Sequence, residues 1–298
     1  MTTRSTFVFI FLFLSVIHCI HAQDVLQALE DASVEDSSPT IATFKGTRIS
    51  IGQSVETRKK GSLEISWMNR FWNRPLPEGQ VTTQSFAADR WNTRIGVDYS
   101  ISDRLTVGAG YVSEYESVDL YGKYRLFYQR DTGRKFPVSI SLFQGGVFRD
   151  NTLNGASFEV PDSNKFASTT QLLIARKVDK NFSVQLAPSF IYRAEDELIE
   201  NESTTYFALG FGARYKVGNH VSLVSEYYYV PSPFVSIDTY GPFSIGANWE
   251  VSDLLLQFKL TNARDFVEDN VIVKTLNNFN FRDGNLHFGF QATYFLQL

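Results

Sequence analysis

The sequence predicts an all-β protein, a closed antiparallel transmembrane β-barrel of about twelve strands. Three observations predict this class: apolar and polar residues alternate along about twelve segments, short and long connections alternate between them, and bulky aromatic residues gather near segment ends. The chain has 298 residues, of which 43% are apolar and 15% aromatic, which excludes a disordered protein. A formal charge of −4 gives no indication of a nucleic-acid partner.

Residues 1–22 have the features of a secretory signal peptide. Arg4 precedes a short apolar run, and the small residue Ala22 marks the expected cleavage site. A lipoprotein signal ending at Cys19 is the alternative, but His18 stands where such a signal needs a small residue. Because Cys19 is the single cysteine, a disulfide scaffold is excluded and we expect a mature chain without cysteine.

Residues 23–61 precede the first expected strand. Residues 23–40 are acidic and poor in large apolar side chains, so we expect a loose periplasmic arm. Residues 44–61 are denser and basic. The favoured interpretation is a periplasmic lead-in to the first strand, and the alternative is a segment that folds into the barrel mouth and narrows or plugs it.

The barrel is expected over residues 62–298, where apolar and polar side chains alternate with a period of two. In residues 91–101, for example, Ile95 and Tyr99 alternate with Arg94 and Asp98, which places the two sets on opposite faces of a strand. No stretch after Ala22 has the roughly 18 continuous apolar residues of a membrane helix. The expected strands are residues 62–71, 91–101, 105–112, 119–128, 137–148, 168–178, 182–193, 205–217, 221–230, 243–251, 254–262 and 286–297.

The connections alternate between short polar turns and longer segments. The short turns are residues 102–104, 130–135, 179–181, 218–220 and 252–253, and the long connections are residues 72–90, 113–118, 149–167, 194–204, 231–242 and 263–285. This alternation, with an even number of strands, is typical of barrels in the outer membrane of Gram-negative bacteria, where periplasmic turns are short and external loops long. Both ends of the barrel chain are then expected on the periplasmic side.

A soluble two-sheet sandwich also alternates and is the competing fold. Here, however, the polar face is rich in glycine, serine and charged residues, while the other face carries bulky aromatic residues near strand ends. Such girdles suit the two interfaces of a bilayer, so we expect them to face lipid. The aromatic residues in question are Trp67, Phe71, Trp91, Tyr99, Tyr111, Tyr215, Trp249 and Tyr294.

Short segments along nearly the whole mature chain match a known family of barrels. They are residues 47–48, 52–57, 59–61, 63–65, 69–71, 171–177, 208–216, 226–230 and 287–290. On these segments the sequence resembles the DUF5777 family, uncharacterised outer-membrane barrels of Bacteroidota. The resemblance implies an outer-membrane β-barrel and brings no substrate with it. The sequence departs from the family before the last strand, where Asn285 stands in place of the second aspartate of a frequent Asp-Gly-Asp-x-His pattern.

Charged residues on the polar face are candidates to line the lumen. Basic residues outnumber acidic ones in this set, so a water-filled lumen is expected to favour anions, whereas a closed, salt-bridged interior is equally compatible with twelve strands. The candidates are Glu64, Arg70, Arg94, Asp98, Lys123, Arg125, Arg193, Arg214, Lys216, Glu226 and Lys259.

The sequence gives little indication of catalysis, because the expected mature chain has only two histidines, His220 and His287. His220 and Ser222 are similar to the His-x-Ser pair of the outer-membrane phospholipase, but they fall in and beside an expected periplasmic turn. Asp283, Asn285 and His287 share one strand face and form a possible polar ligand cluster, yet no fourth metal ligand is evident. We therefore expect no catalytic residues, metal or cofactor.

The leading functional expectation is a narrow pore or transporter for small, in particular anionic, solutes. The second is a structural or docking barrel with a blocked lumen that binds a periplasmic or surface partner protein. The third is a membrane lipid hydrolase. Solute identity, oligomeric state and the role of the external loops lie beyond one sequence.

Overall fold

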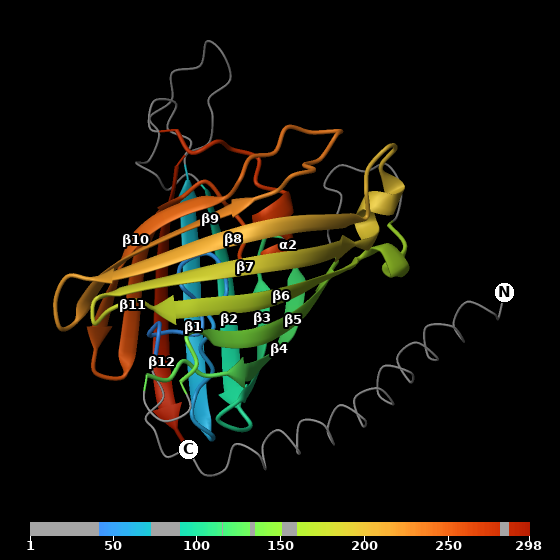
Figure 1. Ribbon diagram of the computed structural model, residues 1–298. Coiled ribbons are helices and arrows are strands. Elements are labelled where there is room, and N and C mark those ends of the chain that lie inside the picture. The colour runs from blue at the N-terminus through green and yellow to red at the C-terminus, as the bar shows by residue number, and fades with distance from the viewer. Residues whose placement is uncertain (1–41, 73–89, 115, 132–134, 151–159, 281–285) are drawn as a thin grey trace. The chain divides into compact units, whose positions relative to one another are not determined.

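Twelve antiparallel strands close into a barrel in the computed structural model of the chain (Figure 1), which describes residues 42–72, 90–114, 116–131, 135–150, 160–280 and 286–298. Each strand pairs with its sequence neighbours, and β1 closes the ring by pairing with β12 from Ser62–Gln297 to Phe71–Phe288. The strands are β1 (Ser62–Trp72), β2 (Arg90–Ser100), β3 (Leu105–Val112), β4 (Ser117–Phe127), β5 (Ser139–Arg149), β6 (Phe166–Lys177), β7 (Phe182–Arg193), β8 (Thr205–Lys216), β9 (Val221–Tyr229), β10 (Phe243–Val251), β11 (Leu254–Thr261) and β12 (His287–Gln297).

The ring confirms the predicted fold class, and the competing two-sheet sandwich is wrong. Each strand bound lies within two residues of its predicted position. The barrel belongs to a compact unit of residues 40–129 and 136–298. No helix in the described part of the chain is long and apolar enough to cross a membrane.

Burial along the strands has the inverted pattern of a membrane barrel. On β2, the polar side chains of Asn92, Arg94 and Ser100 are buried, while Trp91 and Ile95 are exposed. Because the apolar set faces outward and the polar set inward, the outer wall suits lipid and the inner wall suits water, ions or polar chain segments. The aromatic excess therefore lies largely on the outside of the barrel.

The barrel has one end with short turns and one end with long connections. In the β6–β7 turn, the Asp179 carboxylate accepts the backbone N–H groups of Asn181 and Phe182 at 2.7 and 2.9 Å. Gly61, which has a φ of +79°, joins the chain before β1 to the end of β12, since Leu298 N–H donates to its carbonyl at 3.0 Å. Both ends of the barrel chain thus lie at the short-turn end.

Two chain segments fill the interior. The lumen segment, defined as residues 43–56, is buried apart from the half-buried Lys45. The mouth loop, defined as residues 262–275, connects β11 to the last part of the chain and contains the buried helix α2 (Glu268–Val273). Apolar side chains of both segments, including Ile49, Ile51 and Val271, join one buried cluster. Within residues 44–61, residues 44–56 thus lie against the inner wall, whereas residues 57–60 are half-buried or exposed and lead into β1.

Two short 3₁₀ helices complete the described elements. They are η1 (Asp162–Asn164) and η2 (Ala194–Leu198), in the β5–β6 and β7–β8 connections. Asn164 donates its side-chain amide to the carbonyl of Ala194 at 2.9 Å, which ties the two connections together. The long-connection end is therefore held by contacts between loops as well as by the strands.

Candidate functional site

The candidate site is the inner wall together with the two segments that occupy it. Nine of the eleven predicted lumen residues are buried. Arg214 and Lys216 are half-buried near the short-turn end of β8. The nine buried residues are Glu64, Arg70, Arg94, Asp98, Lys123, Arg125, Arg193, Glu226 and Lys259.

The lumen segment is folded into a narrow hairpin. Arg48 and Gln53 form an isolated β-bridge, and Ile49 N–H donates to the carbonyl of Gly52 at 3.1 Å. Below this tip, Ser54 N–H donates to the Thr47 carbonyl at 2.9 Å. The turn leaves the N–H groups of residues 50–52 free of partners within the hairpin, so they need an acceptor from the wall.

Glu226 of β9 supplies that acceptor. Its Oε2 accepts the backbone N–H groups of Ser50, Ile51 and Gly52 at 2.7, 2.6 and 3.0 Å. Three consecutive donors that converge on one oxygen form an anion-binding concavity, of the kind that backbone turns offer to phosphates and carboxylates. The tip is thereby fixed to β9 by a buried charge.

Neighbouring strands β10 and β11 hold the other side of the tip. Gln257 donates its side-chain amide to the Ile49 carbonyl at 2.9 Å, and Lys259 Nζ donates to the Ser50 carbonyl. The hydroxyl groups of Ser50 and Ser244 lie 2.6 Å apart. We define Glu226, Ser244, Gln257 and Lys259 as the tip receptor.

The stem of the hairpin contacts the opposite side of the wall, on β4. Lys123 Nζ donates to the carbonyls of Thr47, Ser54 and Glu56 at 2.7, 3.0 and 3.3 Å. Arg125 Nη2 pairs with Glu56 Oε2 at 2.8 Å. Two predicted basic lumen residues therefore bind the lumen segment itself.

Strands β5 and β7 add two more polar contacts to the stem. Ser141 donates its hydroxyl to the Val55 carbonyl at 2.6 Å. The amide of Gln185 accepts Val55 N–H and donates to the Gln53 carbonyl, both at 2.7 Å. Side chains of the wall thus bind mainly backbone groups of the lumen segment.

On the β1–β2 side, the wall carries two carboxylates and one internal ion pair. The Thr47 hydroxyl lies 3.0 Å from Glu64 Oε2 and 3.4 Å from Asp98 Oδ2. Arg94 makes a two-pronged contact with Asp119 of β4, at 2.9 and 2.6 Å. The Arg94 and Asp119 charges neutralise each other within the wall.

The mouth loop is held by two arginines near the long-connection end. Arg149 Nη2 lies 2.5 Å from Asp269 Oδ1, and Arg193 Nη1 lies 2.7 Å from Asp269 Oδ2. Burial would raise the pKa of the Asp269 carboxyl, but the two guanidinium groups hold it below its ordinary value. Burial, together with the nearby Arg193 charge, lowers the pKa of Lys274 to about 8.

The mouth loop also contacts β1 and leaves little space beside the wall. Arg70 donates to the Ala263 carbonyl at 2.9 Å and also to the Asp265 carbonyl. The cavity between this loop and β4–β6, lined in part by Asp119 and Asp269, has a volume of about 10 Å³. This volume holds roughly one water molecule. The mouth loop therefore packs closely against strands β4–β6.

Several residues of the site were absent from the sequence prediction. Asp119 shares the inward parity of Lys123 and Arg125 on β4, so the same rule could have found it. Arg149 is the last residue of β5 and lies one position beyond the predicted strand of residues 137–148. Glu56, Glu268 and Asp269 lie outside strands, where parity gives no signal.

Of the predicted polar ligand cluster, only His287 is among the residues that the structure describes. Asp283 and Asn285 lie outside the described residues. His287 is buried on β12, with Nε2 at 3.0 Å from Asn277 Nδ2 and its ring 5.5 Å from that of Trp72. Among the residues that the structure describes, no group of three or more His, Cys, Asp or Glu side chains could hold a metal ion.

The His220 and Ser222 pair is split between two environments. His220 lies exposed in the β8–β9 turn. Ser222 is buried on the inner face, where its hydroxyl accepts a hydrogen bond from Arg214 Nε at 3.1 Å. Arg214 also pairs with Glu250 at 3.1 Å. The Ser222 hydroxyl therefore belongs to a polar cluster with these two side chains at the short-turn end of the barrel.

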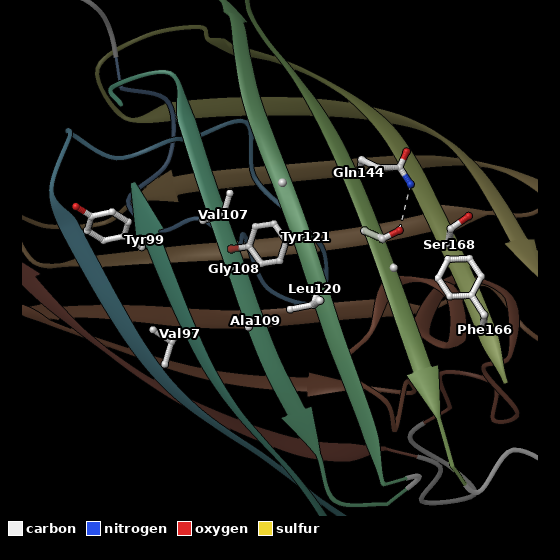
Figure 2. A pocket seen from close by; sticks show the side chains of 13 residues that line it. Val97, Tyr99, Val107, Gly108, Ala109, Leu120, Tyr121, Gln144, Phe166 and Ser168 are labelled. Atoms are coloured by element: carbon white, nitrogen blue, oxygen red, sulfur yellow. Dashed lines mark hydrogen bonds between the residues drawn. The ribbon is translucent and has the colours of Figure 1, made fainter. Parts of the chain in front are cut away.

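A separate depression lies on the outer face of the wall across β2–β6 (Figure 2). It has a volume of about 670 Å³, and its rim includes the exposed side chains of Tyr99, Leu120 and Phe166. Gly122 and Gly146 lie in its lining and add no side chain. The depression faces the lipid side and is not part of the lumen.

Fold and interior together define a membrane β-barrel whose lumen is occupied by its own chain. The chain belongs to the DUF5777 family: the family model, described as a membrane bound beta barrel domain, matches residues 44–296. This confirms the resemblance read from the sequence. The match begins at Phe44, so the family domain includes nearly all of the lumen segment.

Among solved structures, the chain is similar to the KdgM porin, with 8% identity, a TM-score of 0.47, and coverage of 78% of this chain and 98% of that one. It is also similar to the NanC porin, with 6% identity, a TM-score of 0.44, and coverage of 78% and 99%. A third is the COG4313 outer membrane channel from Pseudomonas putida F1, with 13% identity, a TM-score of 0.47, and coverage of 81% and 98%. No curated protein matches the chain.

Proposed function

We propose that this protein is a gated channel for small solutes in the outer membrane of a Gram-negative bacterium, and that the structure represents its closed state. The lumen segment and the mouth loop act as the gate. One observation carries the proposal: the inner wall holds the lumen segment through cationic and amide side chains that bind its backbone carbonyls and the Glu56 carboxylate.

Contacts of this kind are reversible in water. A typical hydrogen bond contributes only about 0.5–1.5 kcal/mol net, because both partners bind water when they separate. The three hydrogen bonds described for Lys123 Nζ all go to the lumen segment, so departure of the segment leaves a solvated ammonium on the wall. A barrel that serves only as a scaffold has no need of such a polar filling.

The open lumen would favour anions. Lys123, Arg125 and Lys259 face the lumen segment, and its departure removes the Glu56 carboxylate that neutralises Arg125. Cationic side chains on a pore wall attract anions and repel cations. This preference extends the sequence-based expectation: the basic surplus of the wall binds the gate when closed and would contact solutes when open.

Single-channel recording of the refolded full-length chain tests the proposal. We expect rare openings for the wild type and more frequent openings for two variants: Glu56→Gln, which removes the ion pair with Arg125, and Lys123→Met, which removes three hydrogen bonds to the lumen segment. Ser50→Cys with Ser244→Cys provides a reversible lock, since the two hydroxyl oxygens lie 2.6 Å apart and the only native cysteine is Cys19 in the proposed signal peptide. The oxidised lock should stay closed and reduction should restore the openings.

Selectivity provides the second readout. Replacing Lys123 and Lys259 with glutamine should shift the reversal potential toward cations, whereas the matched change at exposed Lys180 in the β6–β7 turn should leave it unchanged. Absence of conductance in all of these chains, including the reduced lock, would refute the channel.

The second candidate is a docking barrel for a partner protein, and one observation favours it. The interior is occupied by both the lumen segment and the mouth loop, and the Arg48–Glu268 ion pair of 2.9 Å joins the two. In that case no variant conducts, and a co-purifying protein is lost when exposed loop side chains such as Val235 and Leu198 are changed. We propose no enzymatic role; a lipid hydrolase activity that His220→Ala abolishes would contradict this.

A further inference from the structure

The tip receptor on β9–β11 has the chemistry of a peptide-binding site. Its carboxylate accepts three consecutive backbone N–H groups, and two of its side chains donate to two consecutive backbone carbonyls, those of Ile49 and Ser50. These are main-chain groups that any peptide in the same turn conformation presents. The receptor therefore recognises the shape of a turn more than the identity of its side chains.

Two features of the surrounding wall restrict which turn fits. An added Cβ at Gly52 would lie 2.0 Å from the Tyr228 hydroxyl and 3.0 Å from Glu226 Oε1, so this position accepts only glycine without displacement. An added Cβ at Gly212 of β8 would lie 2.6 Å from Ile49 Cδ1, so the glycine in the wall makes room for that side chain. Ile49 and Ile51 are each 1% exposed. The site thus fits a turn with apolar side chains on both sides of a small residue, followed by glycine.

Other ligand classes fit these groups less well. The Glu226 carboxylate repels phosphates and carboxylates, and it needs several donors at once because it is buried. A sugar hydroxyl offers one rotatable donor, whereas a peptide turn offers three fixed N–H groups beside two carbonyls. The receptor matches these groups with one acceptor, Glu226, and two donors, Gln257 and Lys259. All three lie within a patch of the adjacent strands β9, β10 and β11.

We propose that the tip receptor is a binding site for an external oligopeptide, and that the hairpin tip of residues 48–53 is an internal ligand that occupies it in the closed state. The inference deepens the proposed function and rests on it, because the site becomes accessible only when the lumen segment leaves it. An apolar-Ser-apolar-Gly turn competes with the hairpin tip for the receptor. The substrate class named by this geometry is a short peptide in a tight turn.

Peptide binding to the full-length chain tests the inference. The probe is a fluorescent synthetic peptide of residues 46–56, titrated into the Gly52→Ala chain. In this chain the added Cβ would clash with the Tyr228 hydroxyl, so we expect the tip to leave the receptor, whose own side chains keep their identity. We expect saturable binding. Adding Glu226→Gln to the same chain should weaken binding by about tenfold or more, because a charged acceptor of three hydrogen bonds is lost.

Matched peptides separate turn recognition from adsorption to the barrel. A peptide with an N-methyl group on the residue 51 amide lacks one of the three donors and should bind at least about tenfold more weakly. A scrambled peptide of the same composition should not saturate. Equal binding of all three peptides, or binding unaffected by Glu226→Gln, would overturn the inference.

A second chain keeps the test valid if Gly52→Ala does not fold. The Ser50→Cys and Ser244→Cys lock is incubated with a photo-crosslinking version of the peptide. We expect labelling of β8–β11 after reduction and none in the oxidised form, where the tip is tethered; equal labelling of the two forms overturns the inference. Conductance without specific peptide binding refutes the peptide site alone, whereas peptide binding without conductance refutes the channel alone.

Discussion

Arg48 of the lumen segment and Glu268 at the start of α2 form a buried ion pair with a distance of 2.9 Å between Nη2 and Oε1. Arg48 Nη1 also donates to the Phe266 carbonyl at 3.3 Å, and Gln53 donates its amide to the same Glu268 oxygen at 2.9 Å. The hairpin and the mouth loop are therefore bound to each other as well as to the wall. Movement of one segment should depend on the other.

Breaking this pair should destabilise the closed interior. Arg48→Met leaves the Glu268 carboxylate buried without its cation, and such a loss costs about 3–5 kcal/mol in the free energy of unfolding. Arg48→Met combined with Glu268→Met removes both charges and should recover most of that loss. Urea unfolding of the barrel in lipid vesicles measures the effect. Additive losses in the double variant would show that the two side chains act independently.

Asp269 should control the order of the mouth loop. Asp269→Asn removes the charge that Arg149 and Arg193 share, so two buried guanidinium groups lose their common carboxylate. We expect faster hydrogen exchange over residues 263–275 and little change in the strands. Asp253→Asn in the exposed β10–β11 turn is the matched control. Unchanged exchange in the mouth loop of Asp269→Asn would contradict the assigned role.

The outer face should respond to charge as a lipid-facing surface does. Ile95 lies at the middle of β2, is 56% exposed, and should lie near the bilayer midplane. Ile95→Arg should cost about 2–4 kcal/mol in the free energy of unfolding in a bilayer, whereas Val251→Arg at the end of β10 should cost about 0–1 kcal/mol. Equal small effects at both positions would be incompatible with a spanning wall.

The wall was predictable from the sequence because its signals are local. A period of two reports which face a side chain occupies, and turns such as the one capped by Asp179 are encoded within three or four residues. The inward orientation of Arg94, Lys123 and Glu226 followed from the same parity. The up-and-down order and the even strand count place β1 beside β12, and their pairing closes the ring.

The contents of the lumen were not predictable in the same way. Glu56 lies in a segment without periodicity, and its partner Arg125 is 69 positions away. Glu268 and Asp269 belong to a connection that was expected outside the barrel. The basic surplus was visible because the cations lie on strands, while two of their carboxylate partners, Glu56 and Asp269, lie on irregular segments. Only the closed fold brings the two sets together.

Glu114, beside the β3–β4 connection, should make stability depend on pH. Burial and, to a lesser extent, the Asp265 charge raise the pKa of its carboxyl from 4.5 to about 7. Between pH 4.5 and 7 the folded chain therefore retains a proton that the unfolded chain has released, so this group makes stability fall as pH rises through that range. Below pH 4.5 both states are protonated and the penalty is absent.

The measurement is the unfolding midpoint of wild type and Glu114→Gln in lipid vesicles at several pH values. The variant carries no charge at this position, so it should lack the part of the pH dependence that lies between pH 4.5 and 7. Asp238→Asn, at an exposed position in the β9–β10 connection, is the control for loss of a solvent-exposed carboxylate. If wild type and Glu114→Gln differ by a constant amount from pH 4 to 8, the Glu114 carboxyl is ionised in the folded barrel and its pKa is not raised.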